Sequence, residues 1–238
     1  MGISVIIPTF NEEKNIAKLV KWLHQTRPDK DFEIIVVDGG SSDQTLKVAE
    51  RAGATALLSP EKGRGPQMNF GVENATYGLL YFVHADVLPP KEWPRDIESA
   101  LSEGLVAGCF SYQLDSDKWP LKITEWSTRQ SWFAVGGGDQ TMFVKREVFE
   151  ELGGFRKHLL IMEDFEFVKR LRKKYRYKVI QNNALVSARK YENNSFLYVQ
   201  LINGITVLLF NFGYPQERLA RFYKHALRVK KGGRQLIM

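Results

Sequence analysis

The chain has 238 residues, of which 44% are hydrophobic and 26% are charged, and its formal net charge at pH 7 is +7. This composition is ordinary for a soluble globular protein, and a chain of this length buries enough surface to need no covalent staples. Its one cysteine, Cys109, excludes a disulfide framework and a cysteine-based zinc site. Because the first residues also lack the pattern of a signal peptide, we expect a protein of a reducing, cytoplasmic compartment.

Apolar strands alternate with helices over the first 90 residues. Strands are predicted over residues 3–8, 33–38, 55–58 and 79–86. A helix with an apolar face that ends at Leu23 follows the first strand, and further helices are predicted over residues 45–52 and 67–75. We expect Thr9 or Asn11 to cap the first helix, and Ser41 with Gln44 to form a capping box before the second. Such alternation indicates βαβ units, so the predicted fold class is α/β with a mostly parallel, twisted sheet.

The second half of the chain is less regular. Strands are predicted over residues 106–112, 141–145, 178–180 and 184–188, and a helix over residues 163–174. Residues 119–133 form an aromatic stretch, helical or loop, in which Trp119, Trp126 and Trp132 either stack on an acceptor or serve as core or lid residues. Residues 195–212 are nearly all apolar, but Gln200 and Asn203 favour a buried or interfacial helix over a membrane span.

Basic residues are concentrated near the carboxyl end of the chain. A last amphipathic helix is predicted to end near residue 230. Residues 213–238 contain seven basic residues and one acidic residue, Glu217. A segment of this charge suits an anionic partner such as a membrane surface, although a solvated helix can have the same composition.

Two of the predicted strands end in a carboxylate. Asp38 closes the strand 33–38 and precedes two glycines, and Asp86 closes the strand 79–86. Open α/β sheets bind ligands at the carboxyl ends of their strands, where an ionised Asp needs a partner or a cation. Asp86 is therefore a candidate metal or phosphate-side residue, with a turn cap before Pro89 as the alternative. Asn11 and Asp43 have the same kind of alternative, as a helix cap and a turn residue.

Several other chemistries lack their motifs in this chain. There is no G-x-S-x-G nucleophile elbow and no H-E-x-x-H zinc motif. The loop Gly63-Arg64-Gly65 is a phosphate-loop candidate, but it lacks the Lys-Ser/Thr of a P-loop and the third glycine of a dinucleotide fingerprint. The four histidines lie too far apart in sequence to suggest a metal cluster.

Five motifs, taken in chain order, resemble those of the family 2 glycosyltransferases. They are Pro8-Thr9-Phe10-Asn11-Glu12-Glu13, Asp38-Gly39-Gly40-Ser41-Ser42-Asp43, Gly65 through Asn69 with Gly71, His84-Ala85-Asp86, and Glu163-Asp164. The resemblance extends over about residues 3–190. The chain departs from the family at His84, which stands in the first position of its Asp-x-Asp metal motif. The Q-x-x-R-W pattern of processive synthases is absent, which favours transfer of a single sugar.

The resemblance implies a GT-A fold with a Rossmann-like sheet in a single domain over residues 1–238. It has a nucleotide-binding half (residues 1–90), an acceptor half (91–190) and C-terminal helices (195–230). The implied reaction is a metal-dependent, inverting transfer of one sugar from a UDP- or GDP-type sugar donor to an acceptor hydroxyl, with Mn²⁺ or Mg²⁺ as the cofactor. A lipid-linked or cell-envelope acceptor and peripheral contact of the C-terminal helices with the inner face of a membrane are further expectations. Nucleic acid is not an expected partner.

The resemblance also assigns roles to individual residues. Asp164 is the implied catalytic base and Asp86 the implied metal ligand, although an acidic helix start is the alternative for Asp164. Glu163 is expected on the acceptor side, and Asp139 with Gln140, after three glycines, on the acceptor side or in a flexible loop. The residues expected to bind the nucleotide sugar are Pro8, Thr9, Asn11, Glu12, Asp38, Gly39, Ser41, Asp43, Arg64, Gln67, Asn69, His84 and Ala85.

Two other functions stay open at this stage. A sugar nucleotidyltransferase shares the nucleotide-binding half, but it requires a glycine-rich, basic amino-terminal signature that residues 3–13 lack. A non-catalytic basic module would bind nucleic acid or a membrane in a salt-dependent manner, although strands that end in Asp repel a phosphate backbone.

Overall fold

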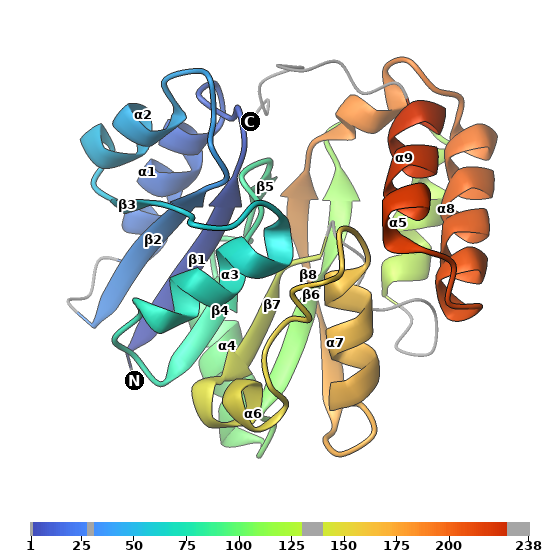
Figure 1. Ribbon diagram of the computed structural model, residues 1–238. Helices are drawn as coiled ribbons and strands as arrows, with labels where there is room; N and C mark the ends of the chain where they lie inside the picture. Colours follow the sequence, from blue (N-terminus) through green and yellow to red (C-terminus); the bar gives the residue numbers. More distant parts are fainter. Residues whose placement is uncertain (1, 28–30, 130–139, 228–238) are drawn as a thin grey trace.

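The computed structural model describes residues 2–27, 31–129 and 140–227, and their strands form one twisted sheet (Figure 1). The sheet has eight strands in the order β3-β2-β1-β4-β7-β6-β8-β5. The strands are β1 (Ile3–Thr9), β2 (Phe32–Asp38), β3 (Thr55–Leu58), β4 (Leu79–Phe82), β5 (Val87–Leu88), β6 (Ala107–Leu114), β7 (Met142–Lys145) and β8 (Tyr177–Val186).

Helices connect the strands and extend beyond the last one. Those in the described residues are α1 (Ile16–Thr26), α2 (Thr45–Arg51), α3 (Arg64–Glu73), α4 (Trp93–Ser102), α5 (Leu121–Thr128), α6 (Arg146–Glu151), α7 (Glu163–Leu171), the short 3₁₀ helix η1 (Ala188–Tyr191), α8 (Phe196–Asn211) and α9 (Gln216–Ala226). In Figure 1, α8 and α9 lie side by side at the edge of the molecule that is furthest from β3.

The strand pairing confirms the predicted mostly parallel α/β sheet. β1 runs parallel to β2 and β4, β2 runs parallel to β3, and β6 runs parallel to β8. The short strand β7 is antiparallel to both β4 and β6, and β5 is antiparallel to β8. In the β1–β2 register Thr9 lies opposite Asp38, so the carboxyl ends of these two strands meet at one edge of the sheet.

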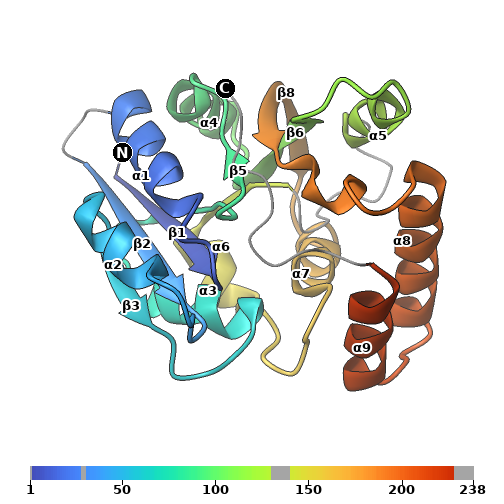
Figure 2. The same ribbon diagram turned by 90° about the horizontal axis from the view of Figure 1, so that it is seen from above.

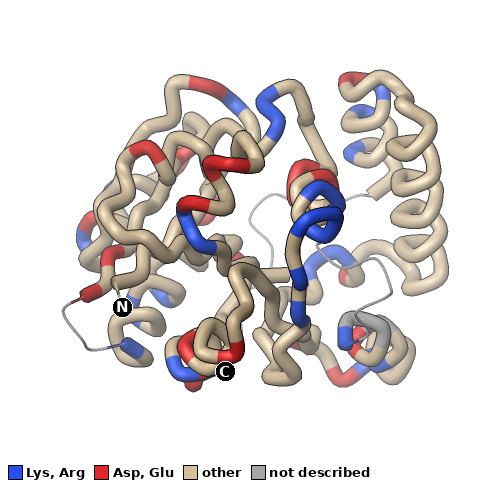
Figure 3. Tube along the Cα trace, turned by 90° about the horizontal axis from the view of Figure 1, so that it is seen from below, with Lys and Arg blue, Asp and Glu red and all other residues tan. Residues whose placement is uncertain are grey.

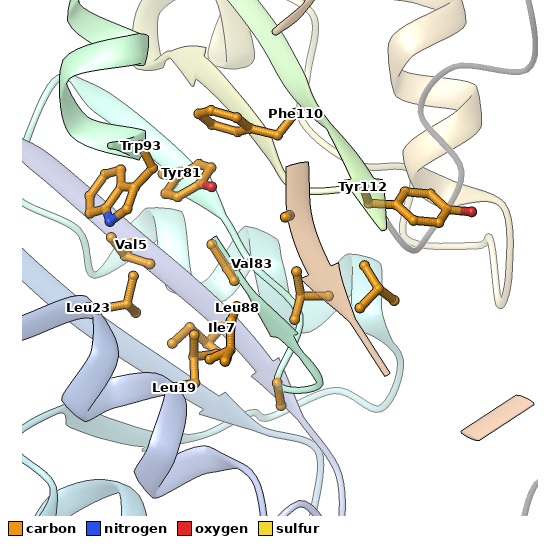
Figure 4. Close-up of a cluster of buried hydrophobic side chains, with 14 of the residues drawn as sticks. Val5, Ile7, Leu19, Leu23, Tyr81, Val83, Leu88, Trp93, Phe110 and Tyr112 are labelled. Carbon is orange, nitrogen blue, oxygen red and sulfur yellow. The ribbon is translucent and has the colours of Figure 1, made fainter. Parts of the chain in front are cut away.

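Helices cover both faces of the sheet (Figure 2). Alternate side chains of β1 point to opposite faces, so that Val5 and Ile7 pack on one face and Ile6 on the other. The first face is covered by apolar residues of α1 and α4, and the second by those of α3, α6 and α7. On the first face Trp93 stacks on Tyr81 with 4.9 Å between ring centroids (Figure 4). These two cores hold the strand ends that carry the candidate site.

Several element boundaries differ from the sequence predictions. The strand predicted over residues 79–86 ends at Phe82, because its partners β1 and β7 pair no further and the chain turns towards β8 through Val87. The two strands predicted over residues 178–188 are one strand, β8, and its irregular pairing opposite Phe110 and Tyr112 disturbs the sequence pattern. Helix α3 begins at Arg64, earlier than predicted, with Pro66 in its first turn, where proline is tolerated.

The predicted helix caps are wrong, and so is the prediction that Trp119 and Trp126 serve as core residues. Gln44 stands at the start of α2 without a side-chain cap, and α1 begins only at Ile16, beyond the reach of Thr9. Instead, Asp43 accepts a hydrogen bond from the backbone N–H of Thr45. Trp119 and Trp126 are more than half exposed and are therefore not core residues; Trp132 lies outside the described residues.

Candidate active site

The loop after β2 is organised by Asp38. Its fully buried carboxylate accepts hydrogen bonds from the backbone N–H groups of Gly40, at 3.0 Å, and Ser41, at 2.7 Å. Gly40 adopts a φ of 90°, a left-handed conformation that glycine reaches without a steric penalty. Gly39 lies so close to α3 that an added Cβ would be 3.1 Å from the Gln67 side-chain oxygen. The acid at the end of β2 therefore orders the loop that the sequence assigned to the nucleotide.

The loops after β1 and β2 are hydrogen-bonded to each other. The backbone N–H of Asn11 donates to Ser41 Oγ at 2.7 Å, and the Asn11 side-chain oxygen accepts from the backbone N–H of Ser42 at 2.8 Å. Asn11 has a φ of 57°, which Asn tolerates better than most residues. The backbone N–H of Glu12 donates to Thr45 Oγ1 at 2.9 Å. These contacts give Asn11 and Ser41 a structural role in addition to the predicted nucleotide contact.

Two predicted nucleotide-binding amides hold α3 against its neighbours. The Gln67 side-chain nitrogen donates to the carbonyls of Thr9, at 2.8 Å, and Val37, at 2.7 Å. The Asn69 side chain makes a hydrogen bond in each direction with the backbone of Phe155. Because both side chains bind backbone groups, they set the position of α3 relative to β1, β2 and the loop before α7.

Glu163 lies beneath the surface at the start of α7. Its side chain is fully buried, and Glu163 Oε1 lies 2.7 Å from Nε of Arg64, which begins α3. Burial raises the pKa of Glu163; the Arg64 charge opposes this shift and the neighbouring Asp164 charge adds to it. The sequence placed Glu163 on the acceptor side. Its burial makes it a residue that ties α7 to α3.

Asp164, the predicted base, faces His84 from the first turn of α7. The distance from His84 Nε2 to Asp164 Oδ2 is 3.7 Å, and both side chains are almost completely buried. Within the part of the chain that the structure describes, Asp164 Oδ2 has no hydrogen-bond partner. A buried carboxylate oxygen without a donor is expensive unless a ligand supplies one. The structure therefore brings together the predicted base and the His-Ala-Asp segment, 80 residues apart.

Asp86 is held by an arginine that the sequence did not single out. Arg189 in η1 places Nη2 2.9 Å from Asp86 Oδ2 and Nη1 2.8 Å from Glu12 Oε1. No local pattern marks Arg189, since it is one of two basic residues in a short polar stretch after β8. Only the folded arrangement of β1, β4 and β8 brings it to the two carboxylates.

The remaining predicted residues lie as follows. Pro8 and Thr9 are buried at the end of β1, and Ala85 is buried beside Asp86. Gln140 is buried just before β7. Asp139 lies outside the described residues.

The donor set around Asp86 fits a hard divalent cation that is shared with a ligand. Within residues 2–27, 31–129 and 140–227 no cluster of three or more His, Cys, Asp or Glu side chains is arranged to hold a metal. Asp86 and Glu12 nevertheless converge on a single cationic group, and carboxylate oxygens are the ligands that Mg²⁺ and Mn²⁺ prefer. A cation here would take only one or two protein ligands and the rest from phosphate oxygens and water.

The fold has a solved counterpart with a bound nucleotide sugar. The structure of a mannosyltransferase from Pyrobaculum calidifontis in complex with GDP-Man and Mn²⁺ matches 94% of this chain and 69% of its own, with a TM-score of 0.67 and 19% sequence identity. The architecture is the GT-A fold, as predicted.

The sequence comparisons identify the family. The model of glycosyl transferase family 2 matches residues 4–160, and the chain belongs to this family. Glycosyltransferase AglE of Haloferax volcanii is 28% identical over 184 residues, which are 71% of this chain and 60% of that protein. Dolichyl N-acetyl-alpha-D-glucosaminyl phosphate 3-beta-D-2,3-diacetamido-2,3-dideoxy-beta-D-glucuronosyltransferase of Methanococcus voltae is 55% identical over 102 residues, which are 40% of this chain and 32% of that protein. The matched region thus spans less than two thirds of either relative.

Proposed function

We propose that the protein is a metal-dependent, inverting glycosyltransferase that moves one sugar from a UDP- or GDP-type donor to an acceptor hydroxyl. The observation that supports this proposal is the approach of Asp164 Oδ2 to His84 Nε2, at 3.7 Å, because His84 lies two residues before Asp86 in the same segment. Membership of glycosyl transferase family 2 supports it over the nucleotidyltransferase and the non-catalytic module.

The proposed reaction assigns one step to each acid. Asp164 accepts the proton of the acceptor hydroxyl while that oxygen forms its bond to the anomeric carbon. The bond from the anomeric carbon to the diphosphate oxygen breaks, and the nucleoside diphosphate leaves with the electron pair. Attack opposite the leaving group inverts the anomeric carbon. A divalent cation, when bound, offsets the negative charge of the leaving diphosphate, and Asp86 is the residue that would hold it, with Glu12 in reach.

The nucleoside is proposed to bind in the amino-terminal half, residues 1–90. The loop residues Asn11, Ser41 and Asp43 offer amide, hydroxyl and carboxylate groups at the ends of β1 and β2, and the buried Asp38 carboxylate holds the loop that carries Ser41. Such groups suit the ring N–H of a base and the hydroxyls of a ribose. Gly40, beside which an added Cβ would meet nothing within 4 Å, leaves room for a ligand to approach the backbone. Residues 91–190 are then the acceptor half.

We further propose a lipid-linked acceptor and peripheral contact with the cytoplasmic face of a membrane. A relative's name refers to a dolichyl phosphate-linked sugar, which supports an acceptor of this class. Of the helices in the described part of the chain, none has the length and apolar content to cross a bilayer. Helix α8 has no charged residue, appears tan throughout in Figure 3, and leaves Leu197, Leu201 and Leu208 exposed. A surface helix of this composition suits an interfacial position.

Thermal unfolding with nucleotides tests the proposed donor. We expect UDP or GDP together with Mn²⁺ to raise the unfolding temperature more than either component alone, with dTDP as a third nucleotide. A ligand at 100 times its dissociation constant adds about 2.7 kcal/mol of stability. In Asp86→Ala the Mn²⁺-dependent part of the shift should disappear. In Glu50→Ala, which removes an exposed acid of α2, it should persist. If no nucleotide stabilises the wild-type protein in the presence of Mn²⁺ or Mg²⁺, the proposed function is wrong.

A further inference from the structure

Arg189 links three segments that are far apart in the sequence. It lies in η1, directly after β8, while Glu12 follows β1 and Asp86 follows β4. One guanidinium contacts both carboxylates, with distances of 2.8 Å to Glu12 and 2.9 Å to Asp86. The backbone N–H of Ser187 also donates to the Asp86 carbonyl at 3.1 Å. The segment after β8 is thus held to Asp86 through both its side chain and its main chain.

The positive charge of Arg189 balances the negative charges of Glu12 and Asp86 only in part. The side chains of Glu12, Asp86 and Arg189 are each no more than a quarter exposed, so bulk water screens them weakly. Two carboxylates face one guanidinium, whose planar fork suits simultaneous contact with both. The Asp86 oxygen that Arg189 contacts belongs to the carboxylate that the proposed function assigns to the cation. A divalent cation and a guanidinium at the same carboxylate repel each other.

We propose that Arg189 is the resident counter-ion of Asp86 and Glu12 in the nucleotide-free protein, and that a divalent cation has to displace it from Asp86. This inference rests on the proposed function. It makes the cation a poor ligand on its own, because each binding event breaks an existing ion pair. The cation binds well only together with a diphosphate, because the negative charge of the diphosphate then pairs with the released Arg189 guanidinium. Arg189 is then a positioning residue that couples cation binding to donor binding.

Mn²⁺ binding to the nucleotide-free protein tests this coupling. The free-Mn²⁺ signal in electron paramagnetic resonance, or titration calorimetry, gives the affinity without any turnover. In Arg189→Gln the two carboxylates lose their counter-ion, so we expect Mn²⁺ alone to bind about tenfold more tightly, a change of about 1.4 kcal/mol. Arg189→Lys keeps the charge but lacks the fork, so its affinity should lie between those of the wild type and Arg189→Gln.

Two further variants separate this effect from a change in net charge. Lys178→Gln removes the same charge from an exposed ion pair with Glu103 at the other end of β8, and it should leave Mn²⁺ affinity unchanged. In the double variant Arg189→Gln/Asp86→Asn the gained affinity should vanish. Circular dichroism and the unfolding temperature establish whether each variant is folded, and Arg189→Lys serves alone if Arg189→Gln is not.

The outcomes keep the inference apart from the proposed function. The proposal that Arg189 is the counter-ion is overturned if folded Arg189→Gln binds Mn²⁺ no more tightly than the wild type. It is also overturned if Lys178→Gln gains the same Mn²⁺ affinity as Arg189→Gln. In that case UDP or GDP binding with Mn²⁺ by the wild type still upholds the proposed function. Absence of nucleotide binding by the wild type, whatever Mn²⁺ does in the variants, overturns the function instead.

Discussion

Glu163 and Asp164 are neighbours in the sequence but lie in different surroundings. Glu163 is fully buried with the Arg64 guanidinium as its ion-pair partner, while Asp164 faces His84 at 3.7 Å. Since the two acids differ in their partners, substitution of each should have a different consequence. The same Glu-Asp pair read in the sequence gives no sign of this division.

Asp164→Asn should abolish sugar transfer while donor binding is kept. Asn has nearly the same shape but cannot take up the proton of a hydroxyl, so the loss belongs to the chemical step. We expect transfer to fall by about 10²-fold or more. The measurement pairs turnover with the nucleotide-induced shift in unfolding temperature. A collapse of nucleotide affinity in a folded Asp164→Asn protein would contradict the base assignment.

Glu163→Gln should change how stability depends on pH. The ordinary pKa of Glu, 4.5, applies to the unfolded chain, and burial raises the pKa in the folded protein. The folded protein therefore binds more protons above pH 4.5, and its stability falls as pH rises from about 4.5 through the raised pKa. Gln does not ionise, so Glu163→Gln lacks this loss.

The measurement for Glu163 is the unfolding temperature of both proteins between pH 4 and 8. As pH rises, the unfolding temperature of the wild type should fall relative to that of Glu163→Gln. The other charged groups around this carboxyl are common to both proteins; they are Arg64, Asp164 and His84. If the unfolding temperature of the wild type instead rose relative to that of the variant with rising pH, the Arg64 charge would have a larger effect on the pKa of Glu163 than burial has.

At the scale of elements, α3 is fitted closely between the sheet and the loops that carry the site. Gly71 lets the helix approach β1, since an added Cβ there would lie 2.5 Å from the Ile6 side chain. At the carboxyl end of α3, the Arg146 guanidinium donates to the carbonyls of Val72, Ala75 and Tyr77 at 2.7–3.1 Å. Carbonyls at a helix end have no partner within the helix, so this arginine completes the turn between α3 and β4.

Arg146→Lys should destabilise the protein by about 1–3 kcal/mol, because one ammonium cannot serve three carbonyls in a fork. Urea unfolding at equilibrium gives the free energy of unfolding. Arg95→Lys, on an exposed position of α4, is the matched control and should stay near the wild type. Equal stability of the Arg146 and Arg95 variants would refute the role of Arg146.

At the scale of the whole molecule, α8 exposes several large apolar side chains at one edge. Leu197, Leu201 and Leu208 of α8 and Phe212 after it are each more than half exposed, while Val199 and Ile202 of the same helix are buried. The neighbouring α9 carries exposed basic residues, Arg218, Arg221 and Lys224. An apolar surface beside positive charge suits an anionic lipid surface.

The double variant Leu201→Glu/Leu208→Glu should lose at least about tenfold in binding to anionic phospholipid vesicles, since burial of one leucine is worth about 1.5–3 kcal/mol. Cosedimentation with vesicles measures it, and added salt should weaken wild-type binding. Leu58→Glu places one such charge on an exposed leucine of β3, far from α8, and should bind as the wild type does. Equal binding by all three proteins would exclude α8 as the membrane contact.

Most of the first half of the fold follows from the sequence. The strands that become β1, β2 and β3 show as β-branched or apolar runs, and their helical connections force parallel pairing. The motifs also place Asp38, Asp86 and Asp164 near the ends of elements. The boundary of β4, the continuity of β8 and the position of Arg189 were not predictable, because each depends on a partner strand or acid far away in the chain.

Periodicity, turn residues and the acids that close strands are local properties, and local properties are encoded by neighbouring residues. They are sufficient for the fold class and the family. The contacts that give the site its electrostatics are long-range: Arg189 and Glu12 are separated by 177 positions and meet only when β8 packs beside β6 in the eight-stranded sheet. Which acid is paired, and with which base, is therefore a consequence of the packing of distant strands.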